Sequence, residues 1–147
     1  MVTVCVAGKF DPIHEGHLDH IMKAATLGDK LIIVTHPDET IQKIKGKVNV
    51  PLWARLVLLC GLVQKLNLRA TIVTDYFDDD GTITQWLYSN KPDIFAKGGD
   101  RTVNNMPPSE LQVCREKGIV IIYNVGSLLN SSTHIMGERG KRVHGNK

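Results

Sequence analysis

The chain is predicted to fold as an α/β domain with a five-stranded parallel sheet and helices on both faces. Two observations predict this class. Short apolar runs rich in Val and Ile alternate with longer amphipathic segments, and prolines and glycines stand where those segments should begin and end. Strands that alternate with helices form right-handed crossovers, which make neighbouring strands parallel. The 147 residues, 42% of them hydrophobic, are enough to bury one sizeable core.

Five segments are expected to be strands because they are short and rich in β-branched residues: 2–7, 30–35, 70–74, 93–97 and 119–123. Four longer segments are expected to be helices: 17–27, 51–66, 82–89 and 108–117. Pro51 and Pro108 suit a first helical turn, and Gly28 and Gly118 suit a helix end. A fifth helix is expected to begin at 131–133. In such a sheet ligands bind beyond the carboxyl ends of the strands, where the turn from Gly8 to His17 lies.

Composition narrows the class of protein. A formal net charge of +3 suits a phosphorylated substrate, but it lacks the clustered charge of a nucleic-acid binder. Aromatic residues make up only 5% of the chain, and no surface interleaves them with basic residues. We therefore expect no nucleic-acid partner. A single domain is expected over residues 1–140, followed by a basic tail at 141–147.

The cysteines and the hydropathy pattern indicate the cellular compartment. Cys5, Cys60 and Cys114 are odd in number and far apart, so they indicate neither a disulfide framework nor a zinc site. No stretch approaches the roughly 18 apolar residues of a membrane helix, and no signal-peptide pattern opens the sequence. The expectation is a cytoplasmic protein without a membrane partner.

The motif His14-Glu15-Gly16-His17 follows the first strand and opens the first helix. A helix that begins near Glu15 directs its free N–H groups and the positive end of its dipole toward the preceding turn. Imidazoles three positions apart lie on the same side of the first helical turn, and each can donate a hydrogen bond to a phosphate oxygen. Gly16 keeps the space between them open. The motif therefore predicts a triphosphate site.

Residues 8–17 (GKFDPIHEGH) resemble the G-x-F-D-x-x-H-x-G-H signature of the cytidylyltransferase-like nucleotidyltransferases. Residues 97–100 (KGGD) are similar to a strand end in the adenylyltransferase domains that act on heptose 1-phosphate, and residues 130–135 (NSSTHI) to the segment that opens the family's last helix. Glycerol-3-phosphate and ethanolamine-phosphate cytidylyltransferases and archaeal FAD synthetases are similar at this level. The resemblance covers nearly the whole chain and implies a Rossmann-like nucleotidylyltransferase fold.

The resemblance also implies a reaction, in which an NMP group passes from CTP or ATP to a small phosphorylated acceptor, such as a sugar or polyol phosphate, and pyrophosphate leaves. Mg²⁺ is expected to arrive with the triphosphate, with Asp11 as its protein ligand; alternatively, Asp11 buttresses the turn before Pro12. A homodimer is expected by analogy. The competing hypothesis is a nucleotide-binding regulatory module without catalysis, and the two intact histidines argue against it.

The resemblance assigns roles to individual residues. Three are expected to be catalytic: His17 at the α-phosphate, His14 at the flanking phosphate oxygens and Lys45 over the triphosphate. A larger set is expected to bind the nucleotide through backbone groups, hydroxyls or charge: Gly8, Lys9, Phe10, Asp11, Gly16, Arg55, Gly99, Asp100, Arg101, Ser131, Ser132 and Thr133.

Some of these residues have an ordinary structural alternative. Lys45 belongs to a lysine-rich segment, 43–47, expected to be a flexible connection, where an exposed lysine usually does nothing specific. Arg55 either reaches a phosphate or is a solvated residue opposite the leucine face of its helix. His36 stands at a strand end, where it either lines the ligand pocket or has no part in it. Glycerol-phosphate-type enzymes carry an arginine shortly before the serine–threonine segment; it is absent at 126–129, and Arg101 or Arg139 would have to replace it.

Overall fold

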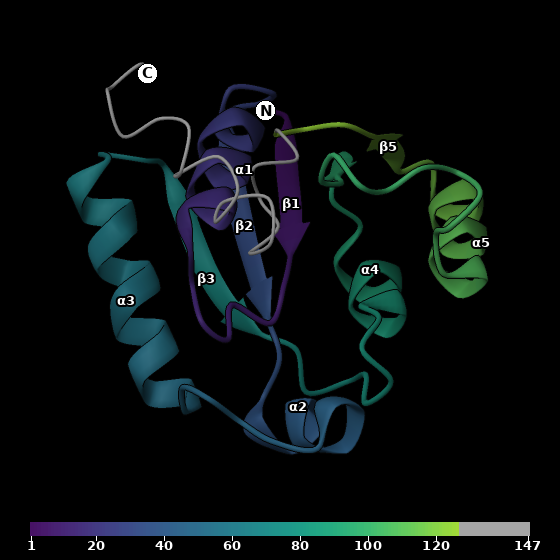
Figure 1. Ribbon diagram of the computed structural model, residues 1–147. Coiled ribbons are helices and arrows are strands. Elements are labelled where there is room, and N and C mark those ends of the chain that lie inside the picture. The colour runs from purple at the N-terminus through teal and green to yellow at the C-terminus, as the bar shows by residue number, and fades with distance from the viewer. Residues whose placement is uncertain (127–147) are drawn as a thin grey trace, which may run out of the picture.

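The computed structural model describes residues 1–126 of the chain. The strands are β1 (Thr3–Ala7), β2 (Lys30–Thr35), β3 (Ala70–Thr74), β4 (Ile94–Ala96) and β5 (Val120–Ile122). The helices are α1 (Glu15–Ala25), α2 (Asp38–Lys45), α3 (Leu52–Lys65), α4 (Thr84–Asn90) and α5 (Pro108–Lys117). All pairings between the strands are parallel, in the order β3-β2-β1-β4-β5 (Figure 1). The predicted fold class is confirmed.

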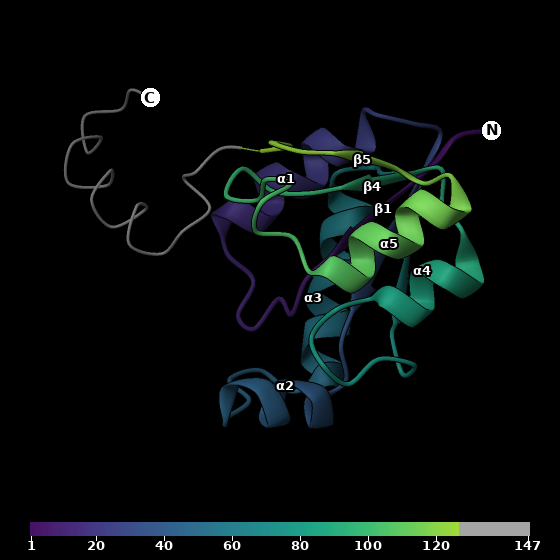
Figure 2. The same ribbon diagram turned by 90° about the vertical axis from the view of Figure 1, so that its right-hand side faces the viewer.

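The sheet separates two apolar cores because successive strand residues point to opposite faces. Val4 and Val6 of β1 pack with α1 and α3, where Ile21 and Leu59 are fully buried. Cys5 points to the other face, into the core beneath α4 and α5. These two helices contact each other and lie side by side over that face (Figure 2). Helices therefore cover both faces, as the sequence predicts.

The strand order places a topological switch point at β1. The chain passes from β1 to β2 and β3 on one side, and then returns to β4 and β5 on the other. Val4 pairs with both Leu31 of β2 and Ile94 of β4. Connections therefore leave the carboxyl ends of β1 and β4 in opposite directions, and ligands of open parallel sheets bind in the crevice this creates. Helix α2 lies beyond the ends of β1 and β2 (Figure 1).

Helix α2 corrects the expectation of a flexible connection at 43–47. Residues 38–45 form a helix that Gly46 ends with a left-handed φ of 81°. Acidic Asp38 and Glu39 occupy its first turn and basic Lys43 and Lys45 its last, which is the arrangement that the helix dipole favours. Lys45 is thus attached to the end of a regular element.

The two glycines expected to end helices have different roles. Gly118 follows α5 with φ 68°, as predicted. Helix α1 instead ends at Ala25, two residues earlier than expected. A Cβ on Gly28 would lie 2.8 Å from the carbonyl oxygen of Val2 and 2.8 Å from Cγ2 of Val4. Gly28 is therefore needed because its loop packs closely against the start of β1.

Several expectations fall outside the described residues: the helix beginning at 131–133, the nucleotide-binding roles of Ser131, Ser132 and Thr133, the substitute role of Arg139, and the tail at 141–147. Within residues 1–126, every helix is too short or too polar to cross a membrane.

Candidate active site

The turn after β1 is held in a strained conformation. Phe10 has a φ of 53°, which is unfavourable for a residue with a Cβ, and its side chain is 1% exposed. Its ring packs in the core and meets the His17 ring edge-on, with the centroids 5.0 Å apart. A Cβ on Gly8 would lie 3.0 Å from the same ring, so glycine allows this close approach. Burial of Phe10 thus offsets the backbone strain and fixes Lys9 and Asp11 on either side of it.

Asp11 ties this turn to the loop between α2 and α3. Its carboxylate oxygens accept hydrogen bonds from the backbone N–H of Asn49, at 2.9 Å, and from that of Val50. The side chain is 5% exposed. Because each oxygen serves a backbone donor, the geometry fits the structural alternative, in which Asp11 holds the turn, and the magnesium role of Asp11 stays a prediction. Residues 1–126 also contain no group of three side chains placed to hold a metal ion.

His14 and His17 form a capping box at the start of α1. Nδ1 of His14 accepts from the N–H of Gly16 at 3.1 Å, and Nδ1 of His17 accepts from the N–H of His14 at 3.2 Å. A neutral imidazole that accepts at Nδ1 carries its hydrogen on Nε2. The rings stack with their centroids 3.9 Å apart. The backbone therefore fixes one tautomer for each ring and leaves each with an Nε2–H donor.

Burial keeps both imidazoles neutral. It lowers the pKa of His14, and it lowers the pKa of His17 to about 4, where positive charge from His14, His20 and Lys45 contributes further. Protonation at Nδ1 would also break the capping hydrogen bonds. At neutral pH the two rings thus act as hydrogen-bond donors rather than as cations.

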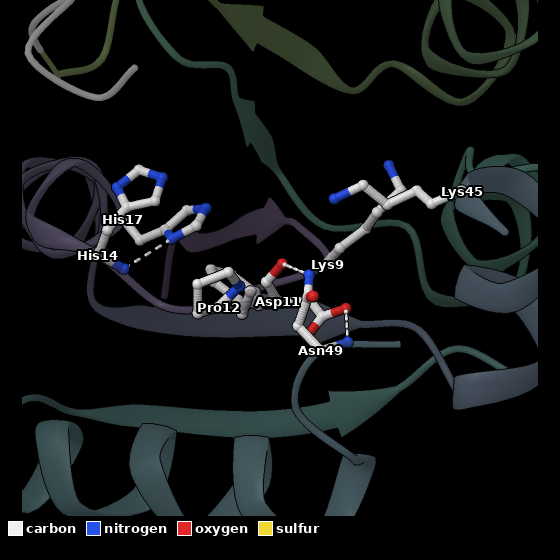
Figure 3. A pocket seen from close by; sticks show the side chains of 8 residues that line it. Lys9, Asp11, Pro12, His14, His17, Lys45 and Asn49 are labelled. Atoms are coloured by element: carbon white, nitrogen blue, oxygen red, sulfur yellow. Dashed lines mark hydrogen bonds between the residues drawn. The ribbon is translucent and has the colours of Figure 1, made fainter. Parts of the chain in front are cut away.

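These side chains line a cavity of about 440 Å³ together with Lys9, Phe10, Asp11, Pro12, Lys45 and Asn49. The histidine rings lie at one end of it, and the side chains of Lys9 and Lys45 reach it from the other (Figure 3). Burial, and then the charges of Lys45 and Arg101, lower the pKa of Lys9.

The lysines at this cavity form no ion pair within the described part of the chain, and the one carboxylate in the lining, that of Asp11, accepts hydrogen bonds from two backbone N–H groups. The ion pairs there are Lys23–Asp19, Lys43–Asp79 and Arg55–Asp38, and none of them involves Lys9, Lys45 or Arg101. Lys43 and Lys45 illustrate the contrast, since Lys43 is paired with Asp79 and is not part of the lining of the cavity that Lys45 lines. Cations held close together without counter-ions favour a polyanion between them.

Arg55 fits neither of its two alternatives: its side chain is not solvated, and it is not accessible to a phosphate group. It is fully buried, and its guanidinium donates to the carbonyl oxygens of Val50 and Lys9, to Oγ1 of Thr35 and to Oδ1 of Asp38. This corrects the expected nucleotide contact. Arg55 positions the Lys9 backbone and joins it to the first turn of α2.

A second, smaller cavity of about 110 Å³ lies at the ends of β1 and β4 on the side of α5. Its lining consists of Ala7, Gly8, Lys9, His36, Gly81, Lys97, Arg101, Pro107 and Glu110. Lys9 lines both cavities, which places them next to each other. His36 thus lines a pocket, as one of its two alternatives predicted.

A family model described as cytidylyltransferase-like matches residues 5–135. The chain belongs to the cytidylyltransferase-like family. The expectation of a nucleotidyltransferase enzyme is confirmed at the level of this family.

Individual relatives agree with the family. The cytidylyltransferase-like chain is 33% identical over 135 residues to the "Bifunctional protein HldE" of Blochmanniella floridana, covering 90% of this chain and 26% of that protein. It is 31% identical over 124 residues to the protein of the same name from Nitrosococcus oceani, covering 81% and 24%. It thus spans about a quarter of the length of these relatives. Among solved structures, the lipopolysaccharide core biosynthesis protein from Thermoplasma volcanium superposes with a TM-score of 0.63 at 26% identity, over 86% of this chain and 97% of the other.

The structure brings many of the predicted site residues together. The first cavity collects His14, His17, Lys45, Lys9, Phe10 and Asp11, and the second collects Gly8, Lys9 and Arg101. Gly16 is buried in α1 and donates its N–H to His14. Gly99 and Asp100 form the turn after β4, outside the lining of both cavities.

Among the polar side chains that line the cavities, those of Asn49 and Glu110 belong to no motif found in the sequence. Asn49 reaches the site through its hydrogen bonds to Asp11. No sequence motif includes Asn49, so there was no reason to select it from the sequence. Glu110 lies in the first turn of α5, where an acidic residue is ordinarily explained by the helix dipole. Only the closeness of α5 to the ends of β1 and β4 reveals it as part of a cavity.

Proposed function

We propose that this protein transfers an NMP group from ATP or CTP to a small phosphorylated acceptor and releases pyrophosphate. The observation that carries the proposal is the first cavity, where two fixed Nε2–H donors face the side chains of Lys9 and Lys45. Hydrogen-bond donors, together with lysines that form no ion pair within residues 1–126, fit the oxygens of a triphosphate.

The cavity supports a direct displacement. A phosphate oxygen of the acceptor attacks the α-phosphorus, the bond from that phosphorus to the bridging oxygen breaks, and the electron pair leaves with pyrophosphate. We assign no covalent intermediate to the histidines, because Nδ1 of each ring accepts a backbone N–H and Nε2 carries the hydrogen, so neither ring presents a free lone pair. The acceleration is therefore assigned to positioning and to stabilisation of charge on the phosphates. His17 donates to the α-phosphate oxygens and the lysines neutralise the leaving group.

The substrates are part of the proposal. Residues 97–100 (KGGD) resemble adenylyltransferase domains, which makes ATP the first nucleotide to test and CTP the second. We also propose a cytoplasmic homodimer. Trp53, Val57 and Leu58 on α3 are 71%, 62% and 52% exposed and supply an apolar surface for self-association. Light scattering on the purified protein tests the dimer independently of activity.

The central test is pyrophosphate release with ATP and CTP in parallel, with Mg²⁺, against sugar phosphates, glycerol 3-phosphate, ethanolamine phosphate and FMN. His17→Ala is expected to lower kcat by at least about 100-fold, since a donor to the transition state is lost. It also removes a capping bond worth about 1 kcal/mol. His17→Asn is the matched control, because its shorter amide can still accept from the N–H of His14. We expect it to restore stability and not activity.

Two outcomes would contradict the proposal. A fully active His17→Ala variant would remove the role of the imidazole. Tight nucleotide binding by the wild type without pyrophosphate release, across all acceptors, would favour the competing hypothesis of a non-catalytic nucleotide-binding module.

A further inference from the structure

The loop between β3 and α4, residues 75–83, contains four aspartates with different partners. Asp75 and Asp80 each accept a hydrogen bond from the backbone N–H two residues further on, at 2.9 and 3.0 Å. Asp78 accepts from two N–H groups in the first turn of α4. Asp79 alone among the four pairs with a lysine of α2, at 2.8 Å. Three of the carboxylates therefore shape the loop and the helix that follows it, and the fourth joins the loop to a different helix.

The loop meets α2 at two adjacent residues of its last turn. Nζ of Lys43 lies 2.8 Å from Oδ2 of Asp79. Ile44 packs on Gly81, where a Cβ would lie 2.9 Å from Cδ1 of the isoleucine. Gly81 has a φ of 89°, a conformation that favours glycine, so its backbone offers the helix a close contact. Figure 1 shows the loop passing beside α2 on its way from β3 to α4. The end of α2 that carries Lys45 is thus attached to this loop.

Helix geometry connects this attachment to the first cavity. Residues two apart in an α-helix are about 200° apart around its axis, so Lys43 and Lys45 lie on opposite sides of α2. Lys43 meets the loop, and Lys45 lines the first cavity. Helix α2 stands beyond the end of the sheet (Figure 2), and only Thr40 and Ile41 of the helix are buried. A helix with so little buried surface depends on the contacts at its ends for its place, so the position of Lys45 follows that of Lys43.

The first cavity contains a repulsion that this attachment opposes. Lys9 and Lys45 line the same cavity from different elements. Burial, and then the charge of Lys45, lower the pKa of Lys9. Like charges repel, so before a phosphate binds the repulsion drives the last turn of α2 away from Lys9. The ion pair of Lys43 with Asp79 holds that turn in place, which lowers the cost of organising the cavity when a ligand arrives.

We propose that Asp79 is a positioning residue, which acts through Lys43 and α2 to keep Lys45 facing the triphosphate. Because Lys45 is assigned to the triphosphate, this role rests on the proposed transferase function. Asp79 lines neither cavity and therefore acts on the ligand through α2. Simple electrostatics predicts the opposite effect, since loss of a negative charge near an anion site strengthens anion binding. The sign of the change in affinity therefore separates positioning from charge.

The first experiment measures affinity by calorimetry with Mg²⁺, using non-hydrolysable ATP and CTP analogues and inorganic tripolyphosphate as probes. Asp79→Asn is expected to weaken binding about threefold, within the range of an exposed ion pair. In a Lys45→Met background the same substitution is expected to cause no weakening, because the side chain that it positions is gone. Lys43→Met should match Asp79→Asn, and the two together should weaken binding no further. Asp79→Glu, which can still pair with Lys43, should restore most of the affinity.

The matched control is Glu116→Gln, which also removes one exposed negative charge. Glu116 lies on α5 and is hydrogen-bonded to Gln112, so this variant is expected to bind every probe as the wild type does. In the pyrophosphate-release assay, Asp79→Asn should raise the KM for the nucleotide about threefold and leave the KM for the acceptor unchanged. Thermal denaturation shows whether each variant is folded.

Three results would overturn the role of Asp79: unchanged or tighter binding by Asp79→Asn, an equal loss of affinity in Glu116→Gln, or the same threefold loss when Lys45 is already methionine. Failure of the proposed function has a different signature. In that case the wild type binds a probe but releases no pyrophosphate with any acceptor, and the affinities still decide whether Asp79 acts through Lys45. If the wild type binds none of the three probes, both proposals are refuted.

Discussion

Replacement of Arg55 by methionine is expected to lower the free energy of unfolding by about 3–5 kcal/mol, because the lost guanidinium is fully buried and donates four hydrogen bonds, one of them to the partly exposed Asp38. The guanidinium donates to the carbonyl oxygens of Val50 and Lys9 at 3.0 and 3.1 Å, to Thr35 Oγ1 at 2.8 Å and to Asp38 Oδ1 at 2.7 Å. Methionine fills much of the same space but leaves these four acceptors without their donor. Three hydrogen bonds from the guanidinium to uncharged acceptors at about 1 kcal/mol each, plus the one to the Asp38 carboxylate, give this total.

Urea unfolding followed by far-UV circular dichroism measures this change. Arg115→Met is the control, because Arg115 is an exposed arginine of α5, and it should stay within about 0.5 kcal/mol of the wild type. Arg55→Lys keeps the charge but not the planar fork, so its stability should lie between those of the wild type and Arg55→Met. A loss of less than about 1 kcal/mol in Arg55→Met would refute the reasoning.

A double-mutant cycle with Asp38→Asn isolates the ion pair from the other three bonds. Asp38 also accepts from the N–H of Leu52 at 3.1 Å, a role that an asparagine oxygen retains. We expect a coupling energy of about 1–3 kcal/mol between positions 55 and 38. A coupling energy near zero would show that Arg55 acts only through the carbonyl groups and Thr35.

Two further predictions concern stability. Burial, and then a hydrogen bond to Asp78, raise the pKa of Asp75 from 3.8 to about 7, so stability should fall as the pH rises through that interval. The free energy of unfolding should fall by at most about 1.4 kcal/mol per pH unit. Asp75→Asn should flatten this pH dependence in urea titrations. An unchanged pH dependence would show that Asp75 does not hold a proton in the folded protein. Gly28→Ala should destabilise by about 1–3 kcal/mol because its Cβ meets the Val2 carbonyl oxygen. Gly61→Ala, with nothing within 4 Å, should stabilise by about 0.5–1 kcal/mol, and equal effects would contradict the packing argument.

The sheet was predictable because each strand is a short apolar run with its own boundaries, and parallel order follows from the alternation with helices. Helix α2 was missed because its lysines were interpreted as a mobile connection. Its boundary signals were nevertheless present: acidic residues at 38 and 39, basic residues at 43 and 45, and Gly46 at the helix end. These boundary signals were sufficient to predict α2 from the sequence.

Local geometry predicts the site only where its residues are neighbours in sequence, whereas Lys45 and Arg101 were assigned to it through the family resemblance. His14 and His17 are three positions apart, so helix geometry alone brings them together. Glu110 and His36 are 74 positions apart and meet because β1 lies between β2 and β4, an order that no local pattern displays. Arg55 was misjudged for a related reason. Its helix presents a leucine face to the sheet, and the sequence does not show that α2 and the Lys9 turn enclose the other side.

Fold and site use different atoms of the same residues. Nδ1 of each histidine caps α1, and the opposite Nε2–H remains for a ligand. The carbonyl of Lys9 is bound by Arg55, and its ammonium is left in the cavity. The backbone contacts restrict each side chain before any substrate arrives, so less conformational entropy is lost on binding. A substitution that removes a whole side chain therefore disturbs both roles, which is why a variant such as His17→Asn, which keeps an acceptor for the N–H of His14, separates catalysis from stability.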